Sequence, residues 1–336
     1  MSSGASSLWQ DARRWLPGVL ISLLAVFAIF RLVRWQDVGQ AFRLIRVDYL
    51  LIAVALTFVF LAARALAWQS LLEDKATFRQ TFFTINAGYL LNNLFPLRAG
   101  ELGRAVLMGQ QSGLGMMHVL STIVLERAFD LAVAAGLLLS TLPLALGMDW
   151  ARPIALMTLA LVLAGLVALY GMARYNEKVH DWVMRLGKRS AWVERWIVPQ
   201  IDNLLRGLRV LVQPARFLRS VFWILVSWLT AVVLYYVMVL SIAPQAPWWW
   251  GAFLDSMLAV GIAIPAAPAA LGTFEGSLIG ALALLNVPYA PAFAYAVSIH
   301  SMQVLITGIL GFVGLAREGR SVTALFAELR LRQTTK

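Results

Sequence analysis

Long apolar runs separated by short polar stretches extend from residue 16 to residue 316. A helix that crosses a bilayer needs about 20 mainly apolar residues. The runs that meet this requirement are predicted to be six spanning helices: Leu16–Val33, Tyr49–Leu72, Val119–Leu146, Ile154–Met172, Val221–Ile242 and Ala292–Ala316. Two further apolar stretches, 81–108 and 251–287, are interrupted by proline and glycine. The pattern predicts an all-α polytopic membrane protein that forms a single domain over 1–336, with two broken hairpins between its spanning helices.

The first broken stretch has an apolar run that ends among Asn92, Asn93, Pro96 and Gly100. Proline removes a backbone donor and clashes with the preceding helical turn. Unpaired backbone survives in hydrocarbon only where it is buried in protein or faces a wet cavity. We therefore expect a re-entrant hairpin that enters from the cytoplasm and returns to it.

The second broken stretch carries Pro265, Pro268 and Gly272, followed by Glu275. It is expected to enter from the outer face and return there. Both stretches have the same order of features: an apolar half-helix, a proline, a glycine and then a glutamate. The glutamate is Glu101 in the first stretch and Glu275 in the second. Interrupted segments at corresponding positions of two halves indicate an inverted repeat with a substrate site near the midplane. The halves would be residues 16–146 and 221–316.

Ionisable residues near these breaks form the predicted binding site. They are Arg98, Glu101 and Arg104 at the first break, Glu126, Arg127 and Asp130 in the next helix, and Glu275 after the second break. Charged groups inside a membrane are costly and normally face the protein interior in pairs. The planar fork of arginine can bind a phosphate through two hydrogen bonds. One interpretation is a polar path for an anionic head group, with Asn92 and Asn93 beside it; the other is that pairs such as Arg98–Glu126 or Arg104–Asp130 only hold helices together.

Three other polar residues in the predicted helices have simpler explanations. Arg64, near the end of its helix, is expected to snorkel to the interface. His300 and Gln303 are expected to form an interhelical hydrogen bond rather than a proton relay.

Composition supports the membrane assignment and limits the chemistry. Hydrophobic residues make up 60% of the chain and charged residues 13%, against about 45–50% and about 25% in soluble domains. The chain has no cysteine, its three histidines lie far apart, and no nucleotide-binding signature occurs. We therefore predict no catalytic residue, no metal and no cofactor.

The net charge of +11 predicts membrane topology rather than nucleic-acid binding, because the basic residues lie between the hydrophobic runs. Residues 173–219 hold ten basic and four acidic residues, and the tail 317–336 is also basic. Both are assigned to the cytoplasmic side, against the anionic inner leaflet. Within the loop, residues 201–212 predict an amphipathic helix that lies on the membrane or packs on the protein's own helices.

Loops with few basic residues are assigned to the outer face. The loops 141–152 and 243–251 carry almost no basic charge, and the second contains Trp248–Trp250. With both termini in the cytoplasm, the four arginines of residues 31–46 lie outside.

The stretch Asn92–Arg104, NNLFPLRAGELGR, resembles the N-x-x-P-x-R-x-G-E-x-x-R signature of the lysylphosphatidylglycerol synthase/flippase transmembrane-region family. Residues 126–130, ERAFD, resemble its E-R-x-x-D element. Arg64 with Trp68, and Pro268 through Glu275, are similar to two weaker elements. The second break departs from the family pattern because it is rich in alanine where glycine is expected.

The resemblance implies a membrane region that moves lipid between leaflets, without the soluble aminoacyltransferase domain found in some members. The implied partner is a phospholipid or a polyprenyl-linked lipid of the bacterial inner membrane. Two alternatives stay open. One is an integral-membrane transferase with Glu126 and Asp130 as its acidic pair, and the other is a scaffold that delivers lipid to a lipid-modifying enzyme. A second copy of the chain is a further candidate partner.

Overall fold

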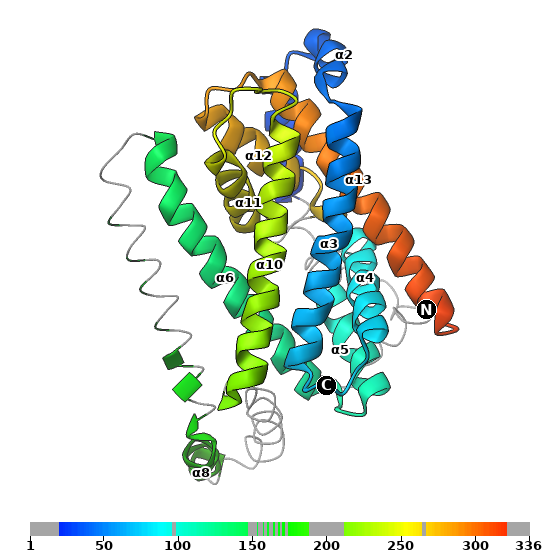
Figure 1. Ribbon diagram of the computed structural model, residues 1–336, viewed down its shortest axis with the longest axis vertical. Coiled ribbons are helices and arrows are strands. Elements are labelled where there is room, and N and C mark those ends of the chain that lie inside the picture. The colour runs from blue at the N-terminus through cyan, green and yellow to red at the C-terminus, as the bar shows by residue number, and fades with distance from the viewer. Residues whose placement is uncertain are drawn as a thin grey trace, which may run out of the picture.

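Helices account for all regular structure in the described chain. The computed structural model describes residues 20–95, 99–146, 176–187, 212–263 and 267–320, with scattered positions between 153 and 175. Four helices in these residues are long and apolar enough to cross a membrane, with 25, 31, 26 and 29 residues. They are α3 (Val47–Leu71), α6 (Met116–Leu146), α10 (Pro214–Val239) and α13 (Tyr289–Arg317). The chain is therefore an all-helical membrane protein (Figure 1).

The predicted count of six spanning helices is not confirmed. Helical residues Leu20–Leu32 cover part of the first predicted span. The predicted span Ile154–Met172 lies mostly outside the described residues, as does the amphipathic stretch 201–212.

Two pairs of shorter helices flank the predicted breaks. They are α4 (Phe78–Leu94) and α5 (Ala99–Ser112), then α11 (Trp249–Gly261) and α12 (Thr273–Leu284). The first pair lies in the lower half of Figure 1 and the second pair in the upper half. Pro96, Arg98 and Pro265 lie outside the described residues. Each predicted break nevertheless coincides with a place where one helix ends and another begins.

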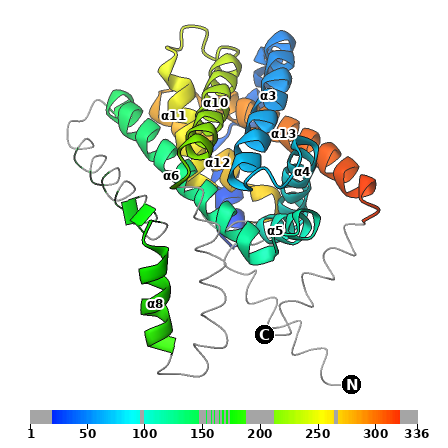
Figure 2. The ribbon, with the colours of Figure 1, turned by 60° about the horizontal axis from the view of Figure 1, so that its bottom comes forward.

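The two halves of the chain pack with matching sets of neighbours. α3 and α10 lie against each other in both views (Figures 1 and 2). α4 packs on α13, and its counterpart α11 packs on α6. α5 packs on α6, and its counterpart α12 packs on α13. The 3₁₀ turn η3 (Pro268–Ala270) of the second break contacts α4. Each of these helix contacts in one half of the chain therefore has an equivalent contact in the other half.

Close backbone approach holds the first break together. The N–H of Gly100 donates to Oδ1 of Asn92 at 2.8 Å, which satisfies an amide at the start of α5. A Cβ atom added at Gly100 would lie 1.9 Å from the carbonyl oxygen of Gly88. Only glycine allows α4 and α5 to touch in this way, as small residues do in membrane helix pairs.

The second break satisfies its backbone through side chains. The N–H of Gly272, whose φ is +82°, donates to Oε2 of Glu275 at 2.8 Å. The N–H of Ala267 donates to Oγ of Ser22 at 2.8 Å, so the segment Leu20–Leu32 covers this break. Polar partners of this kind are required wherever irregular backbone lies at membrane depth.

The outward sides of the long helices carry large apolar side chains. Phe222 and Leu229 of α10 and Leu305, Ile309 and Phe312 of α13 are exposed. An apolar surface of this extent is a liability in water and is suited to lipid. The described surface therefore agrees with a membrane location.

Candidate functional site

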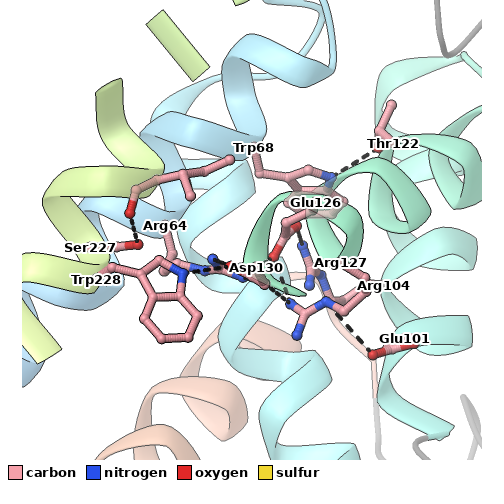
Figure 3. Close-up of polar contacts among 11 residues, drawn as sticks. Arg64, Trp68, Glu101, Arg104, Thr122, Glu126, Arg127, Asp130, Ser227 and Trp228 are labelled. Carbon is pink, nitrogen blue, oxygen red and sulfur yellow. Dashed lines mark hydrogen bonds and ion pairs between the residues drawn. The ribbon is translucent and has the colours of Figure 1, made fainter. Parts of the chain in front are cut away.

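An ion-pair cluster lies where α3, α5 and α6 meet (Figure 3). Arg64 of α3 binds Asp130 of α6 with two hydrogen bonds, from Nη1 to Oδ1 at 2.5 Å and from Nη2 to Oδ2 at 2.8 Å. The same Nη2 also donates to Glu126. Glu126 and Asp130 are four residues apart, so both lie on one face of α6. Arg64 is therefore the central cation of the cluster.

Arg104 reaches the cluster from α5. Its Nη2 donates to Oε2 of Glu126 at 2.8 Å. The guanidinium carbon lies 4.1 Å from the ring centre of Trp68, a cation–π contact. Gly88 makes room for this side chain, because a Cβ atom there would lie 2.5 Å from Cγ of Arg104. The glycine of α4 thus allows α5 to present its arginine to α6.

The cluster has a buried part and an accessible edge. The side chains of Arg64 and Arg104 are 4% exposed, and Glu126 is 2% exposed. Arg127 and Glu101, by contrast, are 37% and 28% exposed. Nη2 of Arg127 donates to Glu126 at 2.8 Å, and its Nε lies 3.9 Å from Glu101. Arg127 and Glu101 therefore form the accessible edge of the cluster.

The donors of the buried arginines are not all used. The Nε atoms of Arg64 and Arg104 are buried and have no hydrogen-bond partner among the described residues. Buried polar groups are normally satisfied by protein or ordered water. Two donors of the cluster are therefore left without an acceptor among the described residues.

Tryptophans on both halves position the cluster. Nε1 of Trp68 donates to Oγ1 of Thr122 at 3.1 Å, which orients the ring beneath Arg104. Nε1 of Trp228, on α10, donates to Oδ1 of Asp130 at 3.0 Å. Helices from both halves of the chain therefore contribute to this site.

The structure brings together five of the predicted site residues: Glu101, Arg104, Glu126, Arg127 and Asp130. The alternative pair Arg104–Asp130 does not form, because Arg104 binds Glu126 and Asp130 binds Arg64. Arg98 lies outside the described residues, so its predicted role stays a prediction. The expectation that Arg64 snorkels to the interface is wrong, since its side chain is buried at the centre of the cluster.

Asn92 and Asn93 form hydrogen bonds at the first break and do not contact the ion-pair cluster in the hydrogen bonds described. Asn92 accepts from Gly100, as described above. Nδ2 of Asn93 donates to Oγ1 of Thr307 on α13 at 3.2 Å. In this arrangement both side chains stabilise the end of α4.

Glu275 belongs to a second polar group, between α12 and α13. Nδ1 of His300 and Oε1 of Glu275 are 2.6 Å apart, and the His300 ring stacks on Phe274. Nε2 of Gln303 donates to the hydroxyl of Tyr235 at 3.2 Å. The expected interhelical hydrogen bonds of His300 and Gln303 are confirmed.

The described residues bring no three metal-binding side chains together. Glu126 and Asp130, the acidic pair predicted for a transferase, are both bound by arginine. Both members of this acidic pair are therefore already bound by a cationic side chain.

Comparison with known proteins finds similarity to a family of membrane proteins. The profile of the family described as "Lysylphosphatidylglycerol synthase TM region" matches residues 15–311. A UPF0104 membrane protein of Methanothermobacter thermautotrophicus is 26% identical over 79% of this chain and 83% of its own length. A UPF0104 membrane protein of Methanocaldococcus jannaschii is 24% identical over 61% of this chain and 83% of its own length. No solved structure matches the chain.

Proposed function

Because the chain belongs to the lysylphosphatidylglycerol synthase transmembrane-region family, we propose that it is a translocase that moves an anionic or phosphate-bearing lipid between the leaflets of the inner membrane. The observation that carries this proposal is the incompletely paired arginine cluster on the candidate spanning helices α3 and α6 and on the shorter helix α5. Ionisable groups at this depth are costly and mark substrate paths.

The graded exposure of the cluster supports entry of a head group at Arg127. A phosphate oxygen that binds Arg127 would compete with Glu101 and Glu126 for the same guanidinium. The buried Nε donors of Arg64 and Arg104 then offer hydrogen bonds deeper in the cluster. The carboxylates thus keep the arginines paired until an anion replaces them, while the acyl chains stay in the lipid.

The matching packing of the two halves supports an inverted repeat. α4 with α5 and α11 with α12 would then be re-entrant hairpins that enter from opposite faces, as their positions in Figure 1 allow. In transporters, such broken helices meet at a midplane site, and rocking of one repeat against the other gives alternating access. The contact of η3 with α4 would join the two breaks at that depth.

The proposed orientation places both termini and the basic loop 173–219 in the cytoplasm. Two arginines of that loop have partners within the protein. Arg216 lies 3.6 Å from Glu73, and Arg219 donates to Ser70 at 2.8 Å. In this proposal the basic excess of the loop faces the anionic inner leaflet.

Two other functions receive less support. A metal-dependent transferase would need carboxylates that can bind a cation, yet Arg64 binds both Glu126 and Asp130. A scaffold that delivers lipid to an enzyme would not require the donors of the arginines to be left unpaired inside the membrane.

Lipid translocation in reconstituted vesicles tests the proposal. Vesicles would carry a fluorescent phosphatidylglycerol or a fluorescent polyprenyl phosphate, and dithionite would quench the probe in the outer leaflet. We expect the protein to bring the inner-leaflet probe of at least one lipid to the outer leaflet, where dithionite quenches its fluorescence. Arg127→Gln should slow this at least about tenfold, because it removes the accessible cation. Arg46→Gln is the matched control. Arg46 pairs with Asp48 as Arg127 pairs with Asp130, but it is exposed and lies at the start of α3, many residues before Arg64.

A rate no faster than that of protein-free vesicles for both lipids would overturn the translocase. An unchanged rate in Arg127→Gln would overturn entry of the head group at Arg127.

A further inference from the structure

α11 carries a buried carboxyl group without a partner. Asp255 is 8% exposed, and its Oδ2 atom is enclosed without a hydrogen bond to any described residue. The buried carboxyl groups of Glu126 and Glu275, by contrast, each have a cationic or hydrogen-bonding partner. Asp255 is therefore an exception that packing alone does not explain.

Ionisable groups on several neighbouring helices interact electrostatically with Asp255. Those that interact with it electrostatically are Asp130 of α6, Arg64 of α3, Tyr235 of α10 and Tyr295 of α13. α12 also packs on α11, and its one ionisable residue is Glu275, which His300 and the amide of Gly272 already hold. Asp255 thus interacts electrostatically with Asp130 and Arg64 of the ion-pair cluster and with Tyr235, which accepts from Gln303.

The nearby arginine does not neutralise Asp255. Both terminal nitrogens of Arg64 are bound to Asp130 and Glu126. An isolated ionised carboxylate is very costly to bury, and protonation removes that cost. A sodium ion would need several oxygen ligands together, whereas Asp130 is already held by Arg64 and Trp228. A proton is therefore the ligand that fits this carboxyl group.

We propose that Asp255 is a proton-binding site and that its protonation and anion binding at the cluster favour each other. An anion beside Arg64 lowers the positive potential that Asp255 experiences, which favours its neutral acid form. By linkage, a protonated Asp255 strengthens anion binding by the same factor. The identity of the anion as a lipid head group rests on the proposed function, but the proton site does not. If both hold, lipid and proton move in the same direction.

Proton uptake on ligand binding tests the coupling. Short-chain phosphatidylglycerol would be added to purified protein in weakly buffered detergent that contains a pH indicator. We expect the wild type to take up protons as it binds, and its affinity to fall about tenfold between about pH 6 and pH 8. Asp255→Asn should bind with no uptake and with an affinity independent of pH.

Two variants control for indirect effects. Asp37→Asn removes an exposed aspartate of α2 (Trp35–Leu44) and should behave as the wild type does. Asp255→Glu keeps a carboxyl group and should keep the uptake, which separates loss of the proton site from loss of folding.

The outcomes separate the two proposals. Binding without uptake in the wild type at every pH between about 6 and 8 would overturn the coupling. Unchanged uptake in Asp255→Asn, or a sodium requirement in place of proton uptake, would overturn the proton site. Each of these results leaves the translocase intact. If the vesicle assay shows no lipid movement, an infrared carboxyl band that changes with pH and is absent in Asp255→Asn would support the proton site alone.

Discussion

Replacing Gly100 with alanine tests whether contact between α4 and α5 holds the first break together. A Cβ atom at this position would lie 1.9 Å from the carbonyl oxygen of Gly88 and 2.7 Å from Oδ1 of Asn92. Real Cβ contacts stay above 3.0 Å, and a backbone carbonyl cannot rotate away as a side chain can. α5 must therefore move from α4 by more than an ångström.

The expected cost follows from these contacts. Overpacking of this kind costs about 1–3 kcal/mol, and loss of the Asn92–Gly100 hydrogen bond adds about 1 kcal/mol. Gly136→Ala in α6 is the matched control, because a Cβ atom there meets nothing within 4 Å. In a helix interior, alanine is favoured over glycine by about 1 kcal/mol. The two identical substitutions should therefore change the free energy of unfolding in opposite directions.

Unfolding in mixed micelles of dodecyl maltoside and sodium dodecyl sulfate, followed by circular dichroism, measures both variants. The vesicle assay then shows whether Gly100→Ala also loses lipid movement, as expected if α5 carries Arg104 away from Glu126. Equal stability of Gly100→Ala and Gly136→Ala would refute the reasoning, because it would mean that the two backbones are not in contact.

Further stability measurements test the cluster and the second break. Glu126→Gln should lower the free energy of unfolding by about 3–5 kcal/mol, because it removes a buried carboxylate that three arginines share; a loss below about 1 kcal/mol in the same micelle assay would contradict the buried pairing. Ala269→Gly should stabilise the protein by about 1 kcal/mol, because Ala269 has a φ of +55° that glycine adopts without strain. Ala283→Gly, in regular α12, is its control and should destabilise by a similar amount.

The breaks could be predicted from sequence because their causes are local. Proline and glycine act on the backbone within a few residues, so α4 ends at Leu94 and α5 begins at Ala99, inside the predicted stretch. The shared face of Glu126 and Asp130 was also predictable, since it depends only on helical spacing. Their partner was not, because Arg64 lies more than 60 residues earlier on another helix.

Asp255 shows a second limit of sequence reasoning. It lies within an apolar run after Trp248–Trp250, and the same pattern would result if a cation were paired with it. Its lack of a described partner depends on how the side chains of α3, α6, α10 and α13 are arranged around α11. No local signal reports such an arrangement.

The two interpretations of the charged residues, helix staple and anion site, describe the same ion pairs. A pure staple would be closed on all sides, yet Arg127 is 37% exposed and Nε of Arg64 has no described acceptor. A permanently open site would leave its arginines hydrated, yet Arg64 and Arg104 are only 4% exposed. Because a buried charge without a partner is very costly, arginines at this depth need carboxylates whenever no ligand is present. Under the proposed function, holding the helices together is therefore what the cluster does between ligands, and the unused donors are the feature that favours an anion site over a staple.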